Sequence, residues 1–234
     1  MDKRIKTPPV VNRLILGAAI VMLAAGAAAA AEHGQEESTI ISGLREALAI
    51  GAENAVKLVS QADGYFGNEL IKILMPDQIR SVAETMGRLG MQKQVDEFIL
   101  AMNRAAEKAG PEALGIFVDA VKNMSIEDAL GILKGEDTAA TEYFKENTSE
   151  SIHEAFKPII STSMSEVGVT NAFKGLMEKA QSLPFVRIDP IDLDEYVTEK
   201  AITGLYFMIG EEEKKIRSDP GARVTDLLKQ VFKK

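Results

Sequence analysis

Apolar residues recur at every third or fourth position along most of this chain, and this spacing limits the available folds more than any other feature. Ser38, a residue type that caps helices, precedes the first such stretch. Glycine and proline residues interrupt the pattern where helices would end or begin. We therefore expect successive helices, at about 39–59, 77–89, 92–109, 111–122, 126–134, 138–146, 149–165, 170–181, 192–217 and 223–232.

The stretch 201–210 is apolar on every side, which is typical of a buried helix. Its ten residues are too few to cross about 30 Å of membrane hydrocarbon. We expect it to lie within the longest helix of the protein, which starts at the acidic cluster around Asp192 and runs to about Arg217. The side chains predicted to be buried there are those of Leu205, Phe207, Met208 and Ile209.

One segment departs from the helical pattern. Residues 71–74 partly alternate between apolar and polar, and they could pair with residues 183–190 as a minimal two-stranded ribbon. The predicted fold class is therefore mainly α, with at most this one ribbon. Because about two hundred residues suit one sizeable core, we expect a single compact multi-helix domain over residues 39–234.

The first residues have the order of a secretory signal peptide. Four basic residues precede an apolar run at 14–23, and alanine dominates 24–31. We predict a cleavable signal over residues 1–31, cut at Ala30 or Ala31, and a flexible N-terminus over 32–38. The expected location is the periplasm or the exterior, with no stable membrane span after cleavage. The alternative is an uncleaved anchor, but ten apolar residues span a bilayer poorly.

Composition excludes several classes of protein. A lipoprotein anchor and disulfides both require cysteine, and the chain has none. The formal net charge is -8, which argues against a nucleic-acid partner, because binding to phosphates relies on clustered Lys and Arg. With only two histidines and no cysteine, we expect no zinc site.

No pattern of a known cofactor site or catalytic site stands out. The chain lacks both the glycine-rich dinucleotide motif and the P-loop, so we predict no cofactor and no catalytic residue. We expect His153 to have a solvated surface role. The acidic cluster of Asp189, Asp192, Asp194 and Glu195 lacks the pattern of a calcium loop, and we expect Asp192 or Asp194 to cap a helix instead. Those at 211–213 are expected to form solvated pairs with the lysines that follow.

The most suggestive polar group is in MNRAAE (102–107), where Asn103, Arg104 and Glu107 share one helical turn. Together with Tyr65 and Phe66 in a glycine-rich loop, these residues are the candidate ligand or partner contacts. The alternative for the polar turn is an Arg104–Glu107 surface pair and an asparagine bonded to a neighbouring loop. For the two aromatic residues, it is that they pack the loop onto the core.

Six blocks resemble, in order, the family known as domain of unknown function 4197. They are GLREAL (43–48), DGYFGN (63–68), MNRAAE (102–107), AATEYF (139–144), DLDEYVTEKAITGLYFMIGEEEKKIR (192–217) and DP (219–220). The resemblance extends over essentially the whole chain after the signal, and it implies an exported bacterial protein of helical character. It implies no activity, ligand or catalytic residue.

Three functions remain open. The first is a non-enzymatic module of the cell envelope that binds an unknown protein or a small apolar ligand. The second is a periplasmic hydrolase or transferase that uses paired carboxylates, such as Glu107 with Asp137 or Glu142. The third is a structural envelope protein that acts by self-association.

Overall fold

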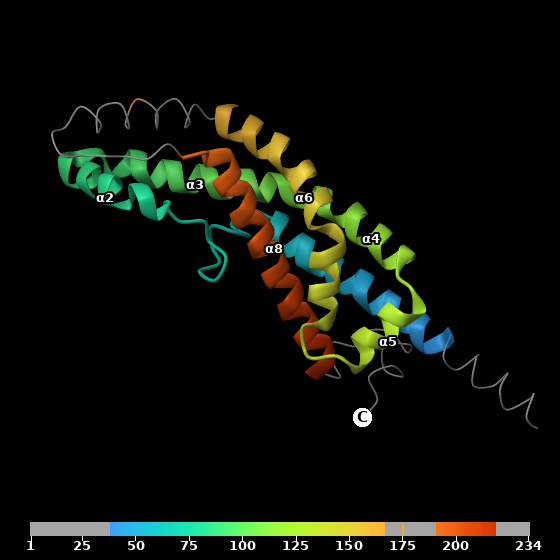
Figure 1. The fold of residues 1–234 in the computed structure, drawn as a ribbon. Coiled ribbons are helices and arrows are strands. Elements are labelled where there is room, and N and C mark those ends of the chain that lie inside the picture. Colours follow the sequence, from blue (N-terminus) through green and yellow to red (C-terminus); the bar gives the residue numbers. More distant parts are fainter. Residues whose placement is uncertain (1–37, 167–174, 176–190, 219–234) are drawn as a thin grey trace, which may run out of the picture.

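The computed structural model describes residues 38–166, Gly175 and 191–218, and it is helical through most of them (Figure 1). An N-terminal helix occupies residues 38–60 as described, so Ser38 is already helical. The helices that follow are α2 (Asp77–Met86), α3 (Gln92–Ala109), α4 (Ala113–Asn123), α5 (Ile126–Lys134), α6 (Ala139–Glu166) and α8 (Leu193–Ser218). The predicted signal, residues 32–37 of the predicted flexible N-terminus, the segment 183–190 and the predicted helix at 223–232 lie outside the described residues, as does the predicted helix at 170–181 apart from Gly175.

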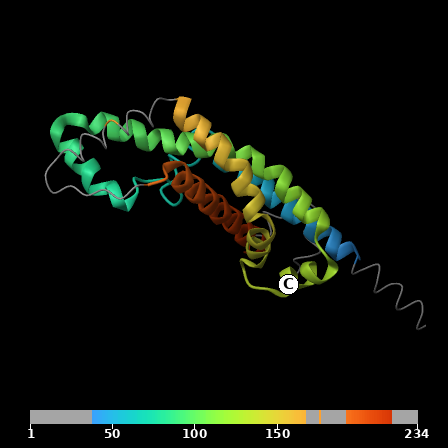
Figure 2. The ribbon, with the colours of Figure 1, turned by 45° about the horizontal axis from the view of Figure 1, so that its top comes forward.

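Local signals in the sequence place several of these helix ends. Gly90 has a φ of 86°, which glycine adopts at little cost, and it lies in the turn Gly87–Met91 that joins α2 to α3. Figure 2 shows these two helices turning back on each other. Ser125 caps α5 in a capping box with Asp128. Pro111 lies in the one-turn 3-10 helix Gly110–Glu112 that precedes α4.

The two helices predicted at 138–146 and 149–165 are wrong as separate elements, because α6 runs unbroken for 28 residues. Asn147 and Thr148 donate side-chain hydrogen bonds to the carbonyls of Tyr143 and Phe144, four residues earlier. Their polar groups are thus satisfied inside the helix and do not end it. Since α8 has 26 residues, the prediction that it is the longest helix is also wrong.

The first strand of the predicted ribbon, at residues 71–74, does not form. Residues 71–74 run from a turn into an irregular extended segment, and no described residue lies in a strand. The side chain of Asn103 on α3 takes the place of a partner strand there, because it bonds both the N–H and the C=O of Ile73. This local partner removes the need for strand pairing.

The core lies where α4, α6 and α8 meet, and α6 packs extensively against α8 and α3. The ring of Phe117 contacts those of Phe144 and Tyr206 edge-on, with centroids 4.9 and 6.1 Å apart. Leu205 and Ile209 are buried, as predicted. Phe207 is a correction, because its side chain points away from the core and is 38% exposed. Met208 is only half-buried.

None of the described helices combines the length and the hydropathy that crossing a membrane requires.

Candidate functional site

A loop at residues 61–76 joins the N-terminal helix to α2, and Glu107 on α3 anchors it. One carboxylate oxygen of Glu107 accepts hydrogen bonds from the backbone N–H groups of Tyr65 and Phe66, at 3.1 and 3.2 Å. The other oxygen accepts from Arg104, whose second nitrogen contacts Asp63 at 2.6 Å. Hydrogen bonding to Glu107 is the main reason that the pKa of Arg104 is raised. We call this group the α3 clasp.

Asn103 holds the next part of the same loop. Its side-chain oxygen accepts from the N–H of Ile73, and its side-chain nitrogen donates to the Ile73 carbonyl, both at 2.8 Å. The same nitrogen also donates to the carbonyl of Ile99. Asn103 is fully buried, so these bonds satisfy polar groups that could not reach water.

Tyr65 ties the loop to α8. Its hydroxyl donates to the carbonyl of Ala201 at 2.7 Å, and the side chain is fully buried. Burial first, and the charge of Glu107 second, raises the pKa of this hydroxyl, so it remains a donor. Gly204 permits the close approach, because a Cβ there would lie 2.7 Å from Cε1 of Tyr65.

The structure thus brings four of the five predicted contact residues into one group, and it places the fifth beside them. Tyr65, Asn103, Arg104 and Glu107 fasten the loop to α3 and α8. Phe66 is half-buried. The ammonium group of Lys72 lies over its ring, 4.4 Å from the ring centroid, in a cation–π contact. Asp63, which the sequence did not single out, completes the α3 clasp.

The outer face of the anchored loop forms one wall of a groove. The opposite wall is α8, and the hollow between them measures about 550 Å³. The hydroxyl of Tyr196 bridges the two walls by donating to the Leu74 carbonyl at 3.0 Å. The lining residues are Leu70, Ile71, Lys72, Leu74, Met75, Asp77, Gln78 and Arg80 on one side, and Tyr196, Glu199, Lys200, Thr203, Gly204 and Phe207 on α8.

Large apolar side chains are exposed along this groove. Leu70 is 74% exposed, Leu74 is 53% exposed and Phe207 is 38% exposed. Only two other described residues of this kind, Leu89 and Ile126, are exposed, and neither lines the groove. The polar side chains of the lining include both basic and acidic groups, and Arg80 is paired with Asp77. Apolar groups of a binding partner would therefore find a hydrophobic surface with a polar edge.

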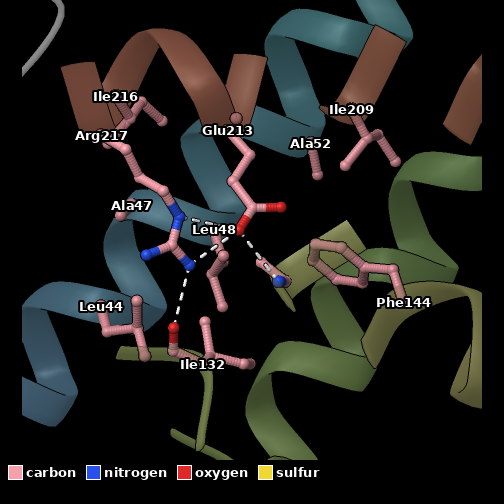
Figure 3. Close-up of a pocket in the computed structure, with 12 residues that line it drawn as sticks. Leu44, Ala47, Leu48, Ala52, Ile132, Phe144, Ile209, Glu213, Ile216 and Arg217 are labelled. Atoms are coloured by element: carbon pink, nitrogen blue, oxygen red, sulfur yellow. Dashed lines mark hydrogen bonds and ion pairs between the residues drawn. The ribbon is translucent and has the colours of Figure 1, made fainter. Parts of the chain in front are cut away.

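A second carboxylate–arginine group lies near the C-terminal end of α8 (Figure 3). The carboxylate of Glu213 accepts from the backbone N–H groups of Ala140 and Thr141, at 3.0 and 2.9 Å. These groups belong to the first turn of α6, which has no intrahelical acceptor for them. Arg217 donates to the same carboxylate and to the Ile132 carbonyl. We call this group the α8 clasp.

The α8 clasp corrects the prediction of solvated acids at 211–213. Glu213 is only 7% exposed, and it caps a helix start 72 positions away in the chain. Glu211 and Glu212 do form the predicted pairs with Lys214 and Lys215, although Glu212 is largely buried. A crevice of about 20 Å³ beside the clasp is lined mainly by apolar side chains, which Figure 3 shows.

One acidic residue at the start of α8 caps that helix. The side chain of Asp192 accepts from the N–H of Glu195 at 3.0 Å, as the sequence predicted. Glu195 itself contacts Lys157 at 2.6 Å and His153 at 2.8 Å on α6. Its pKa is lowered, chiefly by the hydrogen bond from Lys157 and next by that from His153. The predicted solvated histidine is therefore a partly exposed partner of this carboxylate.

The carboxylates proposed for hydrolysis do not meet. Lys108, next to Glu107, pairs with Glu166 at the far end of α6, whereas Glu142 lies in the first turns of that helix. From Glu142 to Glu166 the helix advances by 24 positions, which is roughly 36 Å at 1.5 Å per residue. Asp137 and Glu142 are also exposed. Within the described residues, no group of three or more His, Cys, Asp or Glu side chains could hold a metal ion.

Comparison with known proteins agrees with the blocks found in the sequence. A family model described as a protein of unknown function, DUF4197, matches residues 34–233. No curated protein and no solved structure matches the chain. Since the matched residues are nearly the whole chain, this protein belongs to the DUF4197 family.

Proposed function

We propose that this protein is an exported, non-enzymatic docking module of the cell envelope, and that the groove between the 61–76 loop and α8 receives an apolar segment of a protein partner. One observation carries the proposal: three of the five exposed large apolar side chains among the described residues line this single groove. Gathered apolar exposure is typical of interaction surfaces, whereas scattered single residues are not.

The shape of the groove favours a protein over a small molecule. Small-molecule pockets enclose most of their ligand. Here the apolar residues stand out from the surface, with Leu70 exposed over 74% of its area. Apolar side chains surrounded by charged ones, such as Lys200 and Glu199, match the apolar centre and polar rim of a protein interface.

The loop anchors support a positioned surface. Glu107 and Asn103 bind backbone groups on the inner side of the loop, which leaves Leu70 and Leu74 on its outer side. Ordering a loop before it binds lowers the entropy cost of association. The polar residues of MNRAAE would then act by shaping the groove, and they need no direct contact with the partner.

Export remains part of the proposal. Its support is the order of basic, apolar and alanine-rich segments in residues 1–31, together with a family match that starts at residue 34. N-terminal sequencing of the protein recovered from the cell envelope should begin close to Glu32. An intact Met1 on the recovered protein would contradict cleavage.

The docking groove can be tested with an uncharged fluorescent probe, N-phenyl-1-naphthylamine, which brightens in apolar surroundings. We expect the probe to bind the purified protein and to lose most of this binding in Leu74→Glu and Phe207→Glu. The matched control is Leu89→Glu, which places the same charge on another exposed leucine, away from the groove. Equal binding by all three variants would contradict the proposal. A lipid that copurifies in one-to-one amount would favour the small-ligand alternative.

A further inference from the structure

We infer that the partner of this groove is a second copy of the same chain, and this inference rests on the proposed function. In the pair, Leu70 of each copy inserts into the groove of the other, about a twofold axis. A twofold contact requires a surface that is complementary to itself. The groove surface meets this requirement in shape and in charge.

Its shape combines a projection and a hollow in one place. Leu70, at 74% exposure, lines a hollow of about 550 Å³ whose α8 wall includes Phe207. A twofold rotation would bring the projecting leucine of each copy to the hollow of the other. Both copies would then bury the apolar area that each exposes alone, which is the main favourable term in association.

The charges are also compatible with a second copy. The chain carries a net charge of -8, so two copies repel each other over most of their surface. The groove lining departs from this balance, with three basic residues, Lys72, Arg80 and Lys200, against two acidic ones, Asp77 and Glu199. The groove is therefore a surface where two acidic copies can approach with little repulsion.

Two neighbours on α8 could fix the orientation of the pair. Glu199 and Lys200 both line the groove, and neither forms an ion pair with another described residue. Across a twofold axis, Glu199 of one copy can face Lys200 of the other, and the reverse. Such pairs contribute more to specificity than to affinity.

The test is sedimentation velocity of the purified protein from low micromolar to several hundred micromolar. We expect a reversible dimer whose dissociation constant rises at least about tenfold in Leu70→Glu and stays unchanged in Leu89→Glu. A monomer at all concentrations would overturn the inference. So would a dimer that Leu70→Glu leaves intact.

Charge reversal gives a second and independent readout. Lys200→Glu should weaken the dimer, because two acidic residues then face each other across the axis. The double variant Glu199→Lys/Lys200→Glu should restore the dimer, because both ion pairs between positions 199 and 200 form again with their charges exchanged. A double variant weaker than the single one would contradict this arrangement.

The naphthylamine probe separates the two proposals: a monomer that binds the probe through Leu74 and Phe207 refutes the dimer but keeps the docking groove. If the dimer forms, probe binding should fall as the protein concentration rises.

Discussion

The α3 clasp and the α8 clasp contain the same chemical groups but lie in different surroundings. In each, a buried glutamate accepts two consecutive backbone N–H groups from a distant segment, and an arginine one helical turn away neutralises it. Arg217 is 13% exposed, whereas Arg104 is 39% exposed. The α8 clasp caps a core helix, while the α3 clasp orders a loop beside an open groove. We infer that the first is mainly needed for folding and the second for the shape of the groove.

Glu213→Ala should have the largest effect on stability. It removes the acceptor of the Ala140 and Thr141 N–H groups, and it removes the buried carboxylate that pairs with Arg217, so we expect a loss of about 3–5 kcal/mol. Urea unfolding followed by circular dichroism measures this loss. Glu211→Ala, at an exposed pair on the same helix, is the control and should change stability by less than about 0.5 kcal/mol. Similar losses in the two variants would show that the α8 clasp does not stabilise the fold.

Glu107→Ala should cost less, about 2–3 kcal/mol. Two loop N–H groups lose their acceptor, but Arg104 is partly hydrated and keeps its contact with Asp63. Unfolding in urea, under the conditions used for Glu213→Ala, gives the comparison. A loss larger than that of Glu213→Ala would reverse the order that we assign to the two clasps.

Gly204→Ala tests the fit of the loop on α8. The added Cβ would lie 2.7 Å from Cε1 of Tyr65 and 3.1 Å from Cβ of Ile71, so we expect a loss of about 1–3 kcal/mol. Gly115→Ala in α4 is the matched control, because no atom lies within 4 Å of its added Cβ. It should instead stabilise the protein by about 0.5–1 kcal/mol, through higher helix propensity. Thermal unfolding distinguishes the two, and a stabilised Gly204→Ala would contradict the close packing.

The smallest effect is expected in the pH dependence, at Glu195. Because Lys157 and His153 lower its pKa, this carboxylate favours the folded state at pH values above its ordinary pKa. The contribution is lost as the pH falls through the lowered, folded-state pKa. Urea midpoints between pH 6 and pH 3 should therefore decline less steeply in Glu195→Gln than in the wild type. Glu154→Gln, an exposed neighbour on α6, should retain the wild-type slope.

Helix ends set by local chemistry could be predicted from the sequence. Gly90 and the capping box at Ser125 act within a few residues, so their patterns are visible in the chain. The break predicted near residue 147 failed because Asn147 and Thr148 can also bond back within a helix. Composition and spacing do not distinguish a polar residue that ends a helix from one that bonds back within it.

The candidate site was predictable only in part. The turn with Asn103, Arg104 and Glu107 stood out because three polar residues share one helical face, but its partners lie 30 to 42 positions away. The role of Glu213 was hidden because its partners begin α6, a helix that is far away in the sequence. The groove depends on which face of α8 the loop covers, and this follows from tertiary packing.

The most direct test of the different roles of the two clasps is naphthylamine binding to Glu107→Gln and Glu213→Gln, measured at a low temperature where both variants are folded. Loosening the α3 clasp should disorder the groove, so we predict binding at least about fivefold weaker in Glu107→Gln, equivalent to about 1 kcal/mol. Glu213→Gln should bind the probe as the wild type does, despite its lower stability. Equal binding by the two variants, or weaker binding by Glu213→Gln, would contradict the account.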